Sequence, residues 1–122
     1  MVGKLKAKHD ELASSKLPPD EVAKLLKAGA FLVDVRPKIQ AKMGMAPGAT
    51  NISIFTLKRR LDELPRDRKI VLYCHSGAAA GKAKQVLDAL GYKAFNAGGY
   101  KDVLKIVRAI GSSKAAAAGP RR

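Results

Sequence analysis

The sequence predicts an α/β domain with a mainly parallel sheet. Two short apolar runs rich in β-branched residues, over 30–35 and 69–73, have the length and composition of buried strands. Apolar residues at helical spacing follow the second run, over 83–90. Strands that alternate with helices are typical of a parallel sheet, so these observations together indicate the α/β class.

The first half of the chain predicts a helix and two strands. The helix begins at the turn Leu17-Pro18-Pro19-Asp20 and ends at Gly29. The run 30–35 follows as the first strand, and residues 36–48, with two glycines and two prolines, form a long loop. Alternating residues over 50–54 predict the second strand.

The second half predicts three helices and two strands. They are, in chain order, a short basic helix over 57–64, the central strand 69–73, a helix over 83–90, a strand over 93–96 that runs into a tight turn at Gly98-Gly99, and a last helix over 103–110. Pro65, Gly91 and Gly111 mark the ends of the three helices.

The 122 residues are enough for one domain with a real core. We predict a basic N-terminal arm over 1–14, a folded domain over 15–111 and a disordered, low-complexity tail over 112–122. Lysine and arginine number 24 against 10 acidic residues, which gives a net charge of +14. That charge implies anionic partners but does not choose among them.

The single cysteine excludes an internal disulfide, and a free thiol fits a reducing cytosol. Residues 1–17 lack the apolar core of a signal peptide, and no apolar run is long enough to span a bilayer. We therefore expect a cytoplasmic protein without a membrane span. A periplasmic location stays open if a leader was removed.

That cysteine, Cys74, ends the central strand and precedes a loop of small residues over 76–81. Parallel sheets bind ligands at the carboxyl ends of their strands. Small residues let backbone N–H groups converge on the sulfur, and the start of the next helix favours an anion. A free cysteine is also often a small buried apolar residue. Because Cys74 meets this loop rather than continuing an apolar face, we interpret it as a nucleophilic thiol.

Short motifs occur in order from about Leu17 to Ile110. They are Leu32-Val33-Asp34-Val35-Arg36, Gly44, Pro47-Gly48-Ala49 with Asn51-Ile52, Leu64-Pro65, the run from Ile70 to Gly77, Leu90-Gly91-Tyr92 and Gly98-Gly99. In this order they resemble the single-domain rhodanese (thiosulfate sulfurtransferase) family. The resemblance implies a mainly parallel sheet of about five strands with helices on both faces.

The resemblance also implies an enzyme that transfers sulfane sulfur through a persulfide on Cys74. The donor would be thiosulfate, a polysulfide or a protein persulfide, and the acceptor a thiol or cyanide. Backbone N–H groups of residues 75–79 would hold the persulfide. The expected substrate-binding residues are His75, Ser76, Gly77, Ala78, Ala79 and Lys82. We expect no cofactor, and no metal because two histidines and one cysteine lack zinc-ligand spacing.

The cysteine loop departs from the family pattern. Active loops often read Cys-Arg-x-Gly-x-Arg, whereas His75 and Ala79 replace the two arginines here. The second arginine helps to bind an anionic donor, so we expect weak use of thiosulfate. Lys82 supplies a mobile charge without the planar fork of arginine. His75 is expected to contribute its backbone N–H, and Asp34 and Arg36 are expected to pin neighbouring loops, as in the family.

The loop before the predicted second strand departs as well. The family usually has a glutamate and an aromatic residue followed by Gly-His-Ile-Pro-Gly. This chain has Gln40-Ala41 and then Gly44-Met45-Ala46-Pro47-Gly48. We expect a smaller and more apolar rim, which suits a polysulfide or a protein persulfide.

Other functions stay open. One is a non-enzymatic sulfur carrier or a regulatory module with a vestigial site. A cysteine-dependent phosphatase needs an arginine that clamps phosphate, but Ala79 and Ala80 stand five and six positions after Cys74. A nucleic-acid binder is supported by charge alone, without an aromatic stacking platform, so we do not expect one. The oligomeric state stays open.

Overall fold

The structure is a computed structural model that describes residues 15–118 and the side chains of residues 15–111. Four parallel strands form a sheet in the order β2-β1-β3-β4, which confirms the α/β class. The strands are β1 (Phe31–Asp34), β2 (Thr50–Asn51), β3 (Ile70–Cys74) and β4 (Ala94–Gly99). The helices are α2 (Pro19–Lys27), α3 (Lys38–Lys42), the 3-10 helix η1 (Leu57–Glu63), α4 (Ala78–Ala89) and α5 (Tyr100–Ala118).

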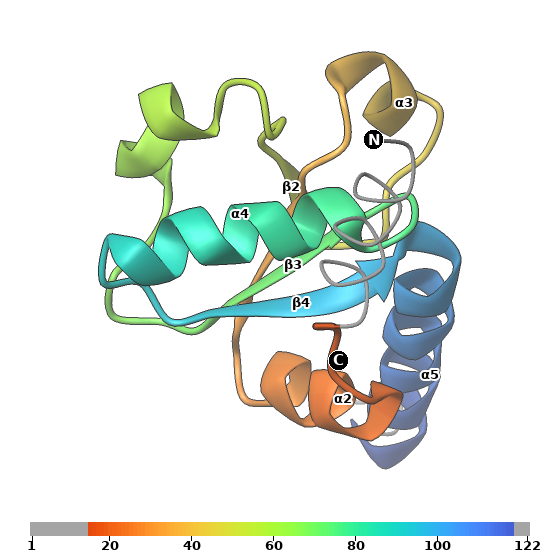
Figure 1. Ribbon diagram of the computed structural model, residues 1–122. Helices are drawn as coiled ribbons and strands as arrows, with labels where there is room; N and C mark the ends of the chain where they lie inside the picture. The colour runs from red at the N-terminus through yellow and green to blue at the C-terminus, as the bar shows by residue number, and fades with distance from the viewer. Residues whose placement is uncertain (1–14, 119–122) are drawn as a thin grey trace.

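Helices cover both faces of the sheet (Figure 1). One core cluster packs α4 and the residues around η1 against the sheet, and the other packs α2 and α5 against the opposite face. Successive side chains of a strand point to opposite faces, and β3 shows this alternation. Ile70, Leu72 and Cys74 face α4, whereas Val71 and Tyr73 face α2 and α5. The strand therefore delivers the Cys74 sulfur to the start of α4.

The sheet was expected to have about five strands, and within residues 15–118 it has four. The segment before α2 lies at the free edge of β4, where the N–H of Leu17 donates to the carbonyl of Asn96 at 2.8 Å. Pro18 and Pro19 follow at once and have no N–H to donate. The prolines therefore prevent this contact from continuing along the chain after Leu17.

Several boundaries differ from the sequence prediction. The predicted loop 36–48 contains α3, which begins directly after Pro37, and the second strand is only Thr50–Asn51. Residues 57–63 form a 3-10 helix with non-helical dihedral angles at Arg60. A five-residue helix is too short to show an apolar period, which is why α3 leaves little trace in the sequence.

The last helix does not end at Gly111, because α5 continues to Ala118. Glycine in a helix costs only about 1 kcal/mol relative to alanine, and the alanines of 115–118 are the best helix formers. The predicted arm 1–14 and residues 119–122 lie outside the described residues, so the domain boundaries stay predictions. Within residues 15–118, no helix is both long and apolar enough to cross a membrane.

Candidate active site

Cys74 is the last residue of β3, and its thiol lies at the amino end of α4. Gly77 turns the chain from the strand into the helix with a φ of 97° and a ψ of −13°. This left-handed conformation is easy for glycine and strained for other residues. The turn places the Cys74 sulfur within hydrogen-bonding distance of two backbone donors. The N–H of Gly77 lies 3.0 Å from the sulfur, and that of Ala80 lies 3.4 Å from it.

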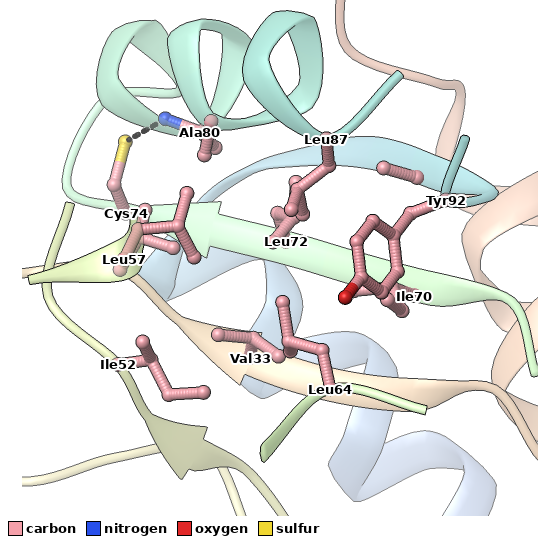
Figure 2. Packing of buried hydrophobic residues seen from close by; sticks show 13 residues of the cluster. Val33, Ile52, Leu57, Leu64, Ile70, Leu72, Cys74, Ala80, Leu87 and Tyr92 are labelled. Carbon is pink, nitrogen blue, oxygen red and sulfur yellow. Dashed lines mark hydrogen bonds between the residues drawn. The ribbon is translucent and has the colours of Figure 1, made fainter. Parts of the chain in front are cut away.

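Figure 2 shows the bond from Ala80 to the sulfur, with Leu72 and Ile70 farther back along the same face of β3. Ala80 is the third residue of α4, and the first N–H groups of a helix have no partner within the helix. The sulfur therefore takes the place of a capping side chain. Cys74 is only 3% exposed, so little of this residue is open to a reactant.

The residues expected to bind substrate divide into two groups. Of the expected residues 75–79, the N–H of Gly77 donates to the Cys74 sulfur, and the second donor is Ala80, which was not among the expected residues. The others are the exposed His75, Ser76 and Lys82 and the half-buried Ala78 and Ala79. Lys82 lies one helical turn after Ala78, so both lie on the same side of α4. The helix start after Gly77 was the sequence signal that could have indicated Ala80.

A hollow of about 400 Å³ opens beside this loop. Its lining residues are Arg36, Gln40, Met43, Gly44, His75 and Tyr100. They come from the end of β1, the α3 segment, the cysteine loop and the start of α5. The hollow therefore reaches the cysteine loop at His75, whereas Cys74 itself does not line it.

Asp34 and Arg36 form a buried ion pair that supports the wall of this hollow. Asp34 is fully buried, and its carboxylate accepts from the Arg36 backbone at 2.8 Å and from its guanidinium at 2.6 and 3.0 Å. The guanidinium also donates to the Gly44 carbonyl and lies 4.3 Å from the centre of the Tyr100 ring. The hydrogen bond to Asp34 raises the pKa of Arg36, although burial acts in the opposite direction. These contacts join β1 to the α3 segment and to α5.

Tyr73 lies beneath the ion pair on the opposite face of β3 from Cys74. It is fully buried, and its hydroxyl accepts a hydrogen bond from the Ala46 N–H at 3.0 Å. Burial is the main cause that raises its pKa, the Ala46 N–H opposes the rise, and the Asp34 carboxylate adds to it. The hydroxyl is therefore harder to ionise in the folded protein than in the unfolded chain.

We expect Tyr73 to make the protein less stable in alkali. A tyrosine in the unfolded chain ionises near pH ~10, so above that pH the folded state binds more protons than the unfolded state. The contribution of Tyr73 to the free energy of unfolding is fully present below pH ~10 and falls as the pH rises further. Urea unfolding of wild type and Tyr73→Phe across this range should show a shallower decline in the variant. Equal slopes would contradict the assignment.

The family model described as a rhodanese-like domain matches residues 18–105, a range that contains all of this site. The chain belongs to the rhodanese-like domain family. The resemblance inferred from the ordered motifs is thereby confirmed.

This rhodanese-like domain is similar to several named sulfurtransferases, and it covers a different share of the length of each. Thiosulfate sulfurtransferase PspE of Escherichia coli is 35% identical over 79 residues, covering 62% of this chain and 76% of that protein. A sulfurtransferase of Allochromatium vinosum is 38% identical over 62 residues, covering 51% of this chain and only 58% of that protein. A solved human single-domain sulfurtransferase has a TM-score of 0.66 and 29% identity, covering 75% of this chain and 96% of that one.

Asn96 is a further residue of this rhodanese-like domain that the sequence analysis missed. Its side chain is fully buried in β4, beneath the cysteine loop. The amide donates to the carbonyl of Gly77 at 2.9 Å and to the hydroxyl of Ser15 at 3.0 Å, while its oxygen accepts from the N–H of Gly98 at 2.8 Å. Asn96 therefore fixes Gly77, the residue whose N–H contacts the Cys74 sulfur.

Gly99 brings the end of β4 close to the same loop. A Cβ atom at this position would lie 2.5 Å from the His75 carbonyl oxygen, closer than real side chains come. Gly98 and Gly99 lie within β4 rather than forming the tight turn that the sequence predicted, although they do pack near the loop. The glycine is needed because two backbone segments approach each other here.

In the described part of the chain, no three histidine, cysteine or acidic side chains come together in a way that could hold a metal ion. The polar groups that meet at the thiol are backbone N–H groups and the amino end of α4. These groups carry partial positive charge, which favours an anion at the position of the sulfur.

Proposed function

We propose that this chain is a sulfurtransferase that carries sulfane sulfur as a persulfide on Cys74. The observation that carries the proposal is the convergence of the Gly77 and Ala80 N–H groups on the sulfur of the only cysteine. The relatives named as sulfurtransferases support the same chemistry. The pair of donors and the start of α4 stabilise negative charge on the Cys74 sulfur, which is present in the thiolate before loading and again after release.

The reaction splits into two displacements. The Cys74 thiolate attacks the outer sulfur of the donor, an S–S bond forms, and the old S–S bond breaks. With thiosulfate, the leaving group is sulfite, which departs with the electron pair of the broken bond. Cyanide or a thiolate then attacks the outer sulfur of the persulfide, which yields thiocyanate or a new persulfide and regenerates the Cys74 thiolate.

Donors differ in how well this loop can bind them. Thiosulfate is small and doubly charged, and a bidentate arginine would match its oxygens, but Ala79 stands where the family pattern has that arginine. The end of a polysulfide or of a protein persulfide is narrow and carries less charge. Such an end suits a thiol that is only 3% exposed. We therefore propose that polysulfide or a protein persulfide is the better donor, and a thiol or cyanide the acceptor.

The variant Ala79→Arg is expected to use thiosulfate better than wild type. The gain should appear mainly as a lower KM, because the donor carries its charge before the reaction begins. Ala79→Gln is the matched control for side-chain length without charge and should show no gain, whereas Lys82→Glu should raise KM. Initial rates of thiocyanate formation measure all four proteins. If wild type already equals Ala79→Arg, the argument from the missing arginine fails.

Asn96→Ala is expected to slow sulfur loading of Cys74. The substitution frees the Gly77 carbonyl from the amide and leaves the Gly98 N–H without its side-chain acceptor. Loss of such buried hydrogen bonds costs about 1–3 kcal/mol of stability. The displaced Gly77 N–H should also lower the rate of sulfur loading by about ten-fold, which is the effect of losing one interaction of modest strength in the transition state.

Asn51→Ala is the matched control for Asn96→Ala. Asn51 also donates two hydrogen bonds, to the carbonyls of Asp34 and Arg36 at 2.9 Å, but it lies in β2, which β1 separates from β3 and Cys74. It should lose comparable stability by urea unfolding and keep the wild-type loading rate. Equal loading rates in the two variants would show that Asn96 is only structural.

The alternative of a sulfur carrier without turnover rests on the two missing arginines. A carrier would load one sulfur and release it to a partner, but it would not turn over repeatedly with excess donor and cyanide. A single loading step followed by sustained thiocyanate formation would favour the enzyme.

A further inference from the structure

Exposed apolar side chains gather in one stretch of the chain. In the part that the structure describes, the large ones are Ile39, Met43, Met45, Phe55 and Leu90. All but Leu90 fall within residues 39–55, between the start of α3 and η1. Apolar side chains that cluster on a surface mark sites of interaction more often than isolated ones do.

The helix α3 arranges these residues in rows. Ile39 and Met43 are four positions apart, so they lie on one face, and they are 76% and 87% exposed. Lys38 and Lys42, one position earlier, form a second exposed row beside the first. Ala41 is the buried residue of this helix. We call Lys38, Ile39, Lys42, Met43 and Met45 the α3 patch.

The α3 patch continues into the candidate active site. Met43 and its neighbour Gln40 line the hollow beside the cysteine loop, together with His75. Figure 1 shows α3 at the same end of the molecule as the turn from β3 into α4. A molecule seated on the α3 patch would therefore lie beside the cysteine loop.

The exposed charges of the α3 patch are both positive. Lys38 and Lys42 are exposed, and the sequence has no aspartate or glutamate between Val35 and Leu61. A surface of exposed apolar side chains flanked by lysines is complementary to an apolar surface flanked by carboxylates. A small anion such as thiosulfate would gain from the charge but not from Ile39 and Met43.

We propose that the α3 patch docks a second protein, one that exchanges sulfur with Cys74 through a cysteine set in acidic and apolar surroundings. The inference rests on the proposed function. In the exchange, the partner's thiolate attacks the outer sulfur of the Cys74 persulfide, a new S–S bond forms, and the Cys74 thiolate leaves with the electron pair of the old bond. The reverse step loads Cys74 from the partner's persulfide, so one surface serves both directions.

The test uses three synthetic peptides with one cysteine each. One has glutamate and leucine around the cysteine, one has lysine and leucine, and one has glutamate and serine. Cys74 is first loaded with polysulfide, and transfer to each peptide and to cyanide is timed at low salt. The glutamate–leucine peptide should react faster than either other peptide by on the order of ten-fold.

Variants locate that preference on the patch. Ile39→Ser should remove the advantage of leucine, and Lys38→Glu with Lys42→Glu should remove the advantage of glutamate, while transfer to cyanide stays at the wild-type rate. Leu90→Ser is the matched control: Leu90 is 42% exposed and follows α4 at the end far from Cys74. It should leave every rate unchanged.

Four outcomes would overturn the docking proposal. Equal rates for the three peptides would exclude the α3 patch from the reaction, and so would equal losses in Ile39→Ser and Leu90→Ser. In both cases, transfer to cyanide would still support the proposed function. Self-association of the chain that Ile39→Ser abolishes would make the patch an interface between copies. Absence of transfer even to cyanide would overturn the proposed function and the docking proposal together.

Discussion

Cys74→Ser is expected to abolish both the loading and the transfer of sulfur. The serine oxygen can still accept hydrogen bonds from Gly77 and Ala80, whose N–H groups contact the thiol in the native protein. A hydroxyl, however, is not ionised near neutral pH and does not form a persulfide. The variant should therefore fold and remain inactive. The measurement is thiocyanate formation from cyanide with thiosulfate or polysulfide as the donor.

Circular dichroism and thermal melting of Cys74→Ser separate loss of chemistry from loss of fold. Cys74→Ala adds a second control, because it removes the acceptor as well as the nucleophile and should be equally inactive. Transfer of sulfur to cyanide by either variant would show that Cys74 is not the carrier.

Asp34→Asn is expected to cause the largest loss of stability. Asp34 is fully buried and Arg36 is 7% exposed, so the substitution leaves a guanidinium with little water and no counter-charge. Breaking a buried ion pair by removing one partner costs about 3–5 kcal/mol. The free energy of unfolding in urea measures this loss. Because Arg36 also holds Gly44 and lies over Tyr100, the hollow beside Cys74 should be disturbed too.

Glu63→Gln is the matched control for Asp34→Asn. Glu63 pairs with Arg60 at 2.6 Å, a distance equal to that of the buried pair, but both side chains are partly exposed. Arg60 lowers the pKa of Glu63 by a hydrogen bond, yet solvent screens such a pair and it contributes little to stability. Similar losses in the two variants would mean that burial does not determine the strength of the Asp34–Arg36 pair.

The sequence indicates the parts of this fold that rest on local pattern. The β-branched runs around Val33 and Val71 identify β1 and β3, and the helical spacing after Gly77 identifies α4. Cys74 could be found because a strand end, small residues and a helix start follow one another in the chain. These signals need no knowledge of distant contacts.

The missed features depend on contacts between distant segments. Asn96 is an ordinary polar residue in a short strand until the fold brings it beneath Gly77, nineteen positions away. Gly99 reads as part of a turn, although its role is to let β4 approach the His75 carbonyl. Within the described residues the edge of β4 receives only the Leu17 N–H, and Pro18 and Pro19 stop the pairing there, a detail that a motif match does not reveal.

The intact mass of the protein after incubation with polysulfide, and separately with thiosulfate, tests the central claim most directly. We expect wild type to gain the mass of one sulfur atom, more completely with polysulfide, and to lose it when cyanide is added. Cys74→Ser should gain nothing under the same conditions. Wild type that gains no sulfur from either donor, or a Cys74→Ser variant that gains as much as wild type, would contradict a persulfide on Cys74.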